Sequence, residues 1–253
     1  MRRQPKWIAL LLCAVMTLAV SAALGEIIPV TLSDEGCSSE ADTVICDETG
    51  VTITAPGEYM LSGSLKDGQV KVDCKEKGKV TLHLDGVTIH HEKGAAILIL
   101  SASPRLRIAL TAGTENLLSN GENLEFTDGD EPNGVIFSKS DLTLEGSGKL
   151  TVTAGSMDGI VSKDDLRIEG GEITVTAPRH GIRGKDCVEI ESGTISVKAG
   201  KDGIRSNNDK DPELGYIAIT GGDIRIVCGD DPLDFVTGLS ITGGTLNSTV
   251  QAN

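Results

Sequence analysis

The chain has 253 residues, of which 23 are basic, 37 are acidic and only six are aromatic, and its net charge is −14. This charge disfavours nucleic acid and anionic membrane surfaces as partners, because like charges repel, and it favours divalent cations. The 31 glycines, together with many Val, Ile and Thr residues, indicate short strands separated by tight turns.

Residues 1–25 have the features of a secretory signal peptide. Arg2, Arg3 and Lys6 precede an apolar stretch that ends near Val20, and small residues follow it. The apolar stretch is short for a membrane span. Cleavage near residue 25 removes three basic and no acidic residues, so 20 basic and 37 acidic residues remain, a net charge of −17. The sequence therefore predicts a secreted bacterial protein, free or associated with the cell surface, with no membrane contact after cleavage.

Residues 26–50 lack the strand pattern of the rest of the chain, and we interpret them as an N-terminal cap. This region contains Cys37 and Cys46, which are close in sequence. Because an exported protein passes through an oxidising environment, a disulfide between these two cysteines is a hypothesis, and the sequence leaves the pairing open. The five cysteines that follow residue 25 leave at least one thiol unpaired.

Residues 51–253 contain a repeat that predicts the fold. Gly159, Gly181 and Gly203 each precede an isoleucine, at intervals of 22 residues. Each unit contains three short strand patterns, as in "GIVS", "LRIEGG" and "ITVTA". Equivalent apolar residues therefore stack in columns, which is typical of a parallel β-helix, and parallel crossovers favour the right hand. We predict an all-β protein, a right-handed parallel β-helix solenoid with coils of about 22 residues and three short strands each.

The last strand pattern, "TLNSTVQAN", is followed by no polar cap for the final coil. An uncovered strand edge promotes association with another chain. We therefore expect either that the solenoid is a short version of a longer one or that another chain covers its C-terminal coil.

Several segments resemble the bacterial carbohydrate-binding β-helix family first recognised as cellulose- and pectin-binding proteins of cellulose-degrading clostridia. They include "GEYMLSGSLKDGQVKVD", "KVTLHLDGVTI" and "DGIVSKDDLRIEGGEITVTA", and the resemblance covers roughly residues 50–246. It implies an extracellular right-handed parallel β-helix, calcium ions at the coil turns, binding of polygalacturonate and cellulose, and a shape similar to calcium-dependent pectate lyases. "DPLDFVTG" at residues 231–238 departs from the family's repeat.

Alignment of the repeats places acidic residues in columns. Residues 22 apart lie on adjacent coils about 4.8 Å apart, where two carboxylates repel by roughly 1 kcal/mol in water and by a few kcal/mol at lower dielectric. A neighbouring lysine column or calcium can offset this repulsion, and the residues alone leave both alternatives open. With the resemblance, we predict a calcium cofactor whose ligands come from Asp158, Asp164, Asp186, Asp202, Asn207, Asn208, Asp209 and Asp231.

Basic residues in the same repeats predict where a polysaccharide binds. We predict carbohydrate contacts from Lys163, Lys185, Arg183 and Arg205. A chain of net charge −17 should repel polygalacturonate unless calcium or these basic residues compensate. The chain after residue 25 has no tryptophan, so the flat face of cellulose is harder to explain. The sequence thus predicts a noncatalytic, calcium-assisted carbohydrate-binding domain over residues 51–253. The alternatives are a calcium-dependent polysaccharide lyase with a lysine base, or a structural or adhesive surface solenoid.

Overall fold

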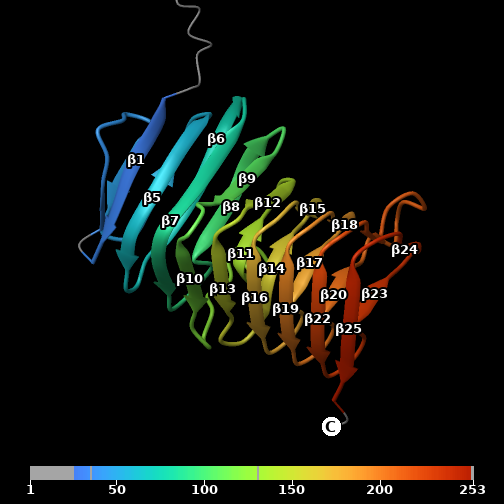
Figure 1. The fold of residues 1–253 in the computed structure, drawn as a ribbon. Coiled ribbons are helices and arrows are strands. Elements are labelled where there is room, and N and C mark those ends of the chain that lie inside the picture. The colour runs from blue at the N-terminus through green and yellow to red at the C-terminus, as the bar shows by residue number, and fades with distance from the viewer. Residues whose placement is uncertain (1–25, 35, 130, 252–253) are drawn as a thin grey trace, which may run out of the picture.

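A computed structural model describes residues 26–34, 36–129 and 131–251 (Figure 1). The predicted signal peptide, residues 1–25, lies outside the described residues. Within the described part the chain forms 25 strands and no helix. No helix of the described residues therefore has the length and apolarity needed to cross a membrane. The predicted all-β class is confirmed.

The larger sheet contains 16 strands, and its centre is the long strand β7 (Val80–His91). One arm extends from β7 through β9 (Leu106–Leu110), β12 (Leu142–Gly146), β15 (Asp165–Ile168), β18 (Cys187–Ile190), β21 (Tyr216–Ile219) and β24 (Gly238–Ile241). The other arm extends through β10 (Glu115–Asn120), β13 (Lys149–Thr153), β16 (Glu172–Ala177), β19 (Thr194–Ala199), β22 (Asp223–Cys228) and β25 (Thr245–Val250). The N-terminal strands of this sheet are β1 (Ile27–Ser33), β2 (Gly36–Ser38) and β5 (Gly57–Leu65).

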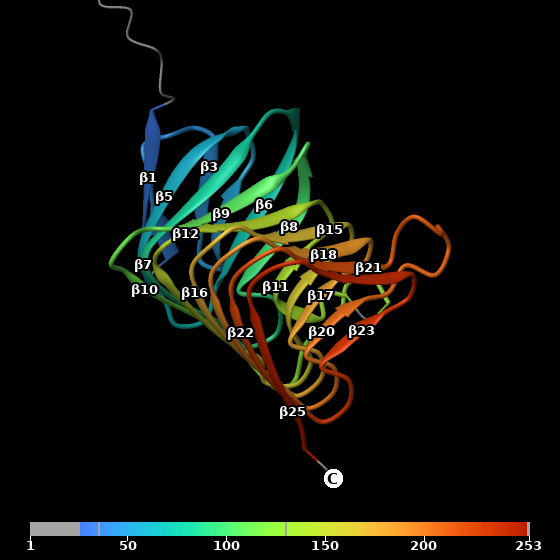
Figure 2. The same cartoon turned by 45° about the vertical axis from the view of Figure 1, so that its right-hand side comes forward.

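The smaller sheet contains nine strands, which are parallel except for the first pair. In chain order they are β3 (Val44–Asp47), β4 (Gly50–Ile53), β6 (Gln69–Lys77), β8 (Ile97–Ser103), β11 (Gly134–Ser138), β14 (Asp158–Ser162), β17 (Ile182–Gly184), β20 (Ile204–Ser206) and β23 (Leu233–Phe235). Figure 2 shows the two sheets from a second side. Buried side chains from both sheets belong to one hydrophobic core, and removal of their apolar surface from water stabilises the fold.

The prediction of a right-handed parallel β-helix solenoid with three-strand coils is wrong. It required three separate columns of strands, but two of the predicted columns join in one continuous path of 13 strands. They join because β7 is long enough to pair with β9 through Val80–Leu84 and with β10 through Thr88–His91. The N-terminal region also contains antiparallel pairs, β1 with β2 and β3 with β4. A repeat of 22 residues does not reveal such a shared strand.

The register that the repeat predicted is present in the strand pairs. Ile160, Ile182 and Ile204 are neighbours on β14, β17 and β20, and all three are fully buried. Leu166 and Val188 are likewise neighbours on β15 and β18. The aliphatic side chains at equivalent positions therefore stack in the core, as the alternating pattern indicates.

The N-terminal region contains a disulfide. Cys37 in β2 is bonded to Cys46 in β3, with their Cα atoms 5.2 Å apart. This finding answers the question of their pairing, which the sequence left open. The strand β1 of the same region pairs in parallel with β5 and so belongs to the larger sheet.

The repeated glycines mark close backbone approaches. A Cβ atom at Gly181 would lie 2.2 Å from Val197 Cγ1 and 2.7 Å from the carbonyl oxygen of Gly203. We expect Gly181→Ala to lower the free energy of unfolding by about 1–3 kcal/mol, because the core has no room for the methyl group. Gly238→Ala is the control, since a Cβ atom there meets no atom within 4 Å. Chemical denaturation of both variants measures the difference, and equal effects would contradict the packing argument.

Candidate functional site

The candidate site lies on the smaller sheet, where β14, β17, β20 and β23 follow one another. Arg183 and Arg205 are direct neighbours on β17 and β20, and Asp234 on β23 follows Arg205. Lys185 comes two residues after Arg183 and follows the end of β17 at Gly184. One pair of predicted carbohydrate contacts, Arg183 with Arg205, is thus brought together.

Arg183 is engaged by a buried carboxylate. Its Nη2 atom lies 2.9 Å from Asp158 Oδ2 and donates a hydrogen bond of 2.9 Å to Asn133 Oδ1. Asp158 is fully buried, and its Oδ1 atom accepts a hydrogen bond of 3.2 Å from the backbone N–H of His180. Asp158, which was predicted as a calcium ligand, is therefore a structural ion-pair partner inside the protein. Arg183 is correspondingly not free to bind a sugar.

Asp202 and Arg205 form a similar ion pair in a later repeat, with one difference. Asp202 Oδ2 lies 2.9 Å from His180 Nδ1 and 3.0 Å from Arg205 Nη1. Burial is the largest effect on His180 and lowers the pKa of its imidazole, although the nearby Asp158 and Asp202 oppose this shift. A neutral His180 leaves Arg205 as the cation beside Asp202. Arg205 is shared with Asp234, because its Nε atom lies 3.1 Å from Asp234 Oδ2.

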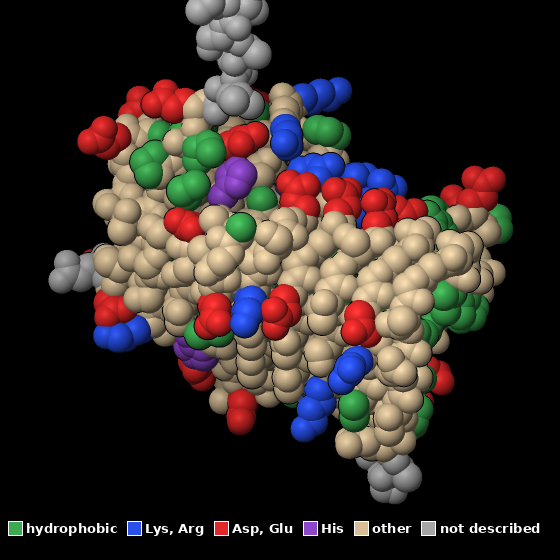
Figure 3. Space-filling model, in the orientation of Figure 1, with side chains coloured by type: hydrophobic (Ala, Val, Ile, Leu, Met, Phe, Trp, Pro, Cys, Tyr) green, Lys and Arg blue, Asp and Glu red, His purple; other side chains and the backbone are tan. Residues whose placement is uncertain are grey.

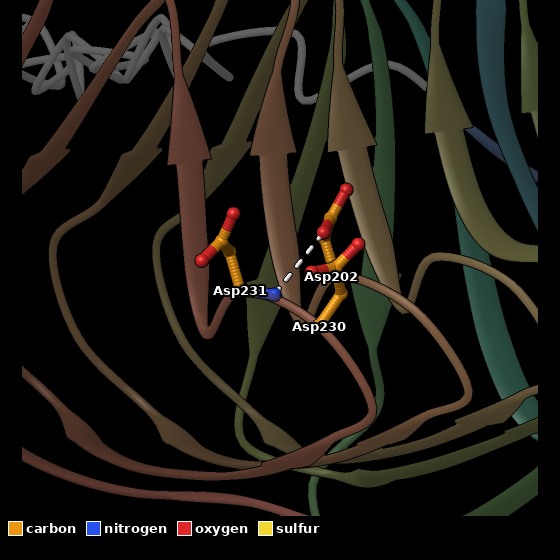
Figure 4. Close-up of side chains that lie close together, drawn as sticks. All are labelled: Asp202, Asp230 and Asp231. Carbon is orange, nitrogen blue, oxygen red and sulfur yellow. Dashed lines mark hydrogen bonds between the residues drawn. The ribbon is translucent and has the colours of Figure 1, made fainter. Parts of the chain in front are cut away.

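Three carboxylates meet at this end of the sheet. Asp202 precedes β20, and Asp230 and Asp231 precede β23 (Figure 4). One carboxylate oxygen from each residue lies within 4.8 Å of the others, and the backbone N–H of Asp231 donates a 3.3 Å hydrogen bond to Asp202 Oδ1. We call these three residues the acidic corner. Asp202 is buried, whereas Asp230 and Asp231 are exposed.

The acidic corner has the donor chemistry of a hard-cation site. Calcium takes six to eight oxygen ligands, and carboxylates supply both oxygen atoms and charge. Arg205 offsets only part of the negative charge of the three carboxylates. Among the predicted ligands, Asp202 and Asp231 are brought together here.

A second acidic column contains the other predicted ligands. Asn208 Nδ2 donates a 2.6 Å hydrogen bond to Asp186 Oδ1, and Asn208 Oδ1 accepts the backbone N–H groups of Lys210 and Asp211. The side chain of Asn208 therefore stabilises the loop that contains it. Asp164 is half-buried nearby.

The remaining predicted residues of this column differ in exposure. Asn207 is half-buried, and its backbone N–H bonds to the carbonyl oxygen of Lys185 at 3.2 Å. Asp209 is exposed. Lys185 Nζ lies 3.8 Å from Asp186 Oδ1, and its side chain is 41% exposed. Lys185 is therefore more accessible than Arg183 among the predicted carbohydrate contacts.

Charged columns elsewhere on the protein are compensated by arginine. On the first arm of the larger sheet, Arg107 contacts Glu145 and Glu169, and Arg167 contacts Glu189. Figure 3 shows acidic and basic side chains beside one another above this arm. These two arginines offset part of the negative charge of the three glutamates that they contact. At the acidic corner, Arg205 is the arginine in contact with Asp202, and it is shared with Asp234.

Comparison with known proteins agrees with a glycan-binding role. The family described as carbohydrate-binding domain-containing protein matches residues 47–253. The chain belongs to this family. The predicted membership of a carbohydrate-binding family is therefore confirmed.

Two relatives of this carbohydrate-binding domain were found. A carbohydrate-binding domain-containing protein of Acetivibrio thermocellus is 41% identical over 147 residues, a match that covers 57% of this chain and 51% of the relative. The chain thus spans about half the length of that relative. A solved structure, described as the polysaccharide lyase-like protein from C. thermocellum in a gadolinium derivative, is 35% identical with a TM-score of 0.79. That match covers 90% of this chain and 96% of the solved one.

Asp164 of this carbohydrate-binding domain provides a test of charge repulsion. Burial, and secondarily Asp141 and Asp186, raise the pKa of its carboxyl above the usual 3.8. A raised carboxyl pKa means that folding favours the protonated form, so the ionised group destabilises the protein as pH rises through the folded-state pKa. We expect Asp164→Asn to raise the unfolding temperature at pH 7 without divalent cations. The gain should disappear below about pH 3.8, where both states are protonated. Asp209→Asn is the exposed control, and a gain independent of pH would contradict this account.

Several site residues were missed by the sequence interpretation. Asp230 stands directly before the predicted ligand Asp231, and the pair "DD" was a usable signal. Glu131 contacts Lys163, and Asn133, which directly precedes β11, bonds to Arg183. Lys163, predicted as a carbohydrate contact, is therefore engaged within the protein.

Proposed function

We propose that this chain is a noncatalytic carbohydrate-binding module that uses calcium to bind an acidic plant cell-wall polysaccharide, polygalacturonate or pectin. The observation that carries the proposal is the convergence of Asp202, Asp230 and Asp231 beside Arg205. Family membership supports a polysaccharide as the partner. The exported location predicted from residues 1–25 is part of the proposal, because this polymer lies outside cells.

Calcium resolves a problem of charge in this proposal. A strongly acidic protein repels a polymer of uronates, whose carboxylates carry the same sign. A calcium ion held by one oxygen from each carboxylate of the acidic corner has ligand positions to spare, since calcium commonly takes six to eight oxygens. A uronate carboxylate can occupy one of these positions. The ion then links two like-charged partners.

Basic side chains on the same sheet as the acidic corner supply additional contacts. Arg205 contacts Asp202 of the acidic corner, Lys185 follows the far end of the neighbouring strand β17, and both side chains are partly exposed and can donate hydrogen bonds to sugar hydroxyl or carboxylate groups. The aromatic platforms that commonly stack on neutral sugars are scarce, because only five aromatic side chains follow residue 25. An acidic polysaccharide is therefore better supported than cellulose.

A lyase is the second candidate, because the solved relative is described as polysaccharide lyase-like. Such chemistry needs a lysine or arginine that accepts a proton from the sugar. Contact with Asp128 raises the pKa of Lys139, and the ammonium group of Lys163 contacts Glu131. The raised pKa favours the charged form of Lys139, which cannot accept a proton. These contacts support a noncatalytic role.

Titration of the purified protein with polygalacturonate tests the proposal, with calcium in one series and a chelator in the other. Ultraviolet absorbance is followed in both series, since a lyase forms unsaturated products. We expect binding only with calcium and no change in absorbance. Binding in neither series would exclude the polygalacturonate proposal, and a rise in absorbance would favour the lyase.

A further inference from the structure

An acidic segment lies across the smaller sheet close to the candidate site. Residues 121–133, which we call the strap, contain five acidic residues and no basic residue; residue 130 lies outside the described part. The strap is held by ion pairs at several points. Glu125 lies 2.6 Å from Lys93, and Asp128 lies 3.1 Å from Lys139.

Apolar side chains lie on the outer side of the sheet, on the strands that precede the lysines contacted by the strap. Phe137 and Val161 are neighbours on β11 and β14, and with Ala95 they form a small buried cluster separate from the main core. Phe137 and Val161 follow Ile136 and Ile160, which face the main core, so alternation points them to the opposite side. Both are nevertheless fully buried. The strap contacts Lys139 and Lys163, which follow the strands that carry Phe137 and Val161.

Glu131 is the central contact of the strap. Its carboxylate contacts the ammonium group of Lys163 through Oε1 and lies 3.4 Å from that of Lys139 through Oε2. Its side chain is only 13% exposed, although it carries a charge. Lys139 and Lys163 follow neighbouring strands, so their ammonium groups form a two-point site for a carboxylate. Glu131 occupies that site.

We propose that the strap is an internal competitor for the acidic polysaccharide, with the Glu131 carboxylate in the position that a uronate carboxylate takes at Lys139 and Lys163. This inference rests on the proposed function for its natural ligand. A tethered carboxylate competes at a high effective concentration, so a single sugar acid displaces it poorly. A polymer that also binds at Lys185 and the acidic corner gains additional contacts with which to displace it. The strap therefore restricts the lysine site to long acidic chains.

Substitution of Glu131 tests the strap directly. Glu131→Gln keeps the shape of the side chain and removes its charge, and we expect it to tighten binding to polygalacturonate roughly 3- to 10-fold at low salt. Glu48→Gln, at an exposed position outside the strap, makes the same change in net charge and should leave affinity unchanged. In the double variant Glu131→Gln/Lys163→Met the gain should be lost. Asp128→Asn, at an exposed contact of the strap with Lys139, is a milder variant that should give a smaller gain.

Dextran sulfate serves as a second polyanion, so that failure of the strap and failure of the proposed function can be distinguished. One outcome is that neither the native chain nor any variant binds polygalacturonate, but Glu131→Gln binds dextran sulfate more tightly than the native chain does. In that case the strap is supported and the polygalacturonate proposal fails. Equal affinities of native protein, Glu131→Gln and Asp128→Asn for both polymers would overturn the strap. An equal gain in Glu48→Gln would also overturn it, because net charge would then explain the effect.

Discussion

Asp158→Ala is expected to lower the free energy of unfolding by about 3–5 kcal/mol, because it leaves a largely buried guanidinium without its carboxylate. Asp158 is fully buried, and Arg183, whose side chain is 14% exposed, lies 2.9 Å from it. The same substitution removes the acceptor for the backbone N–H of His180. Urea denaturation followed by circular dichroism measures the loss.

A second variant distinguishes the unpaired guanidinium from simple cavity formation as the cause of this loss. Asp158→Leu/Arg183→Met removes both charges and should recover a substantial part of the stability lost in Asp158→Ala. Asp42→Ala, at an exposed position, is the matched control and should change stability by no more than about 0.5 kcal/mol. A loss as small in Asp158→Ala as in Asp42→Ala would contradict the structural role assigned to Asp158.

Calcium is expected to raise the unfolding temperature by about 5–10 °C when its concentration is near one hundred times the dissociation constant. An ion bound only by the folded protein contributes about 2.7 kcal/mol of stability under that condition. Asp231→Asn should remove most of this shift, because it withdraws one carboxylate from the acidic corner. The backbone hydrogen bond from Asp231 to Asp202 does not depend on the Asp231 side chain, so stability without calcium should be retained.

Differential scanning calorimetry of the two proteins, with calcium and with a chelator, measures this effect. Asp209→Asn is the control, since Asp209 is exposed in the neighbouring loop and lies outside the acidic corner. It should keep the full calcium-dependent shift. A shift retained in Asp231→Asn and lost in Asp209→Asn would place the ion in the loop instead.

The sequence predicted the strand register of the repeated segments, but it did not predict the arrangement of the irregular segments. The interval of 22 residues placed Ile160 beside Ile182 and Arg183 beside Arg205, because strand pairing preserves register from one turn to the next. It did not predict that two columns of strands share β7. That outcome depends on the length of one strand in the less regular N-terminal half.

The prediction of site residues was limited by burial and by long-range contacts. Asp158 and Asp202 occupy equivalent positions in the repeat, yet Asp158 pairs with a largely buried arginine and Asp202 meets two further carboxylates. Lys163 contacts Glu131, which is 32 residues earlier and outside the repeat. A single sequence shows the types and spacing of these residues, but not which partner from an irregular segment reaches them.

The most direct test of the central claim is the affinity of the native protein and of Asp231→Asn for polygalacturonate, each measured by isothermal titration calorimetry with calcium and with a chelator. We expect the native protein to bind only with calcium, and Asp231→Asn to lose at least about tenfold in affinity, or about 1.4 kcal/mol. Equal binding by the two proteins in calcium, or binding by the native protein that is unaffected by the chelator, would contradict a calcium-bridged site at the acidic corner.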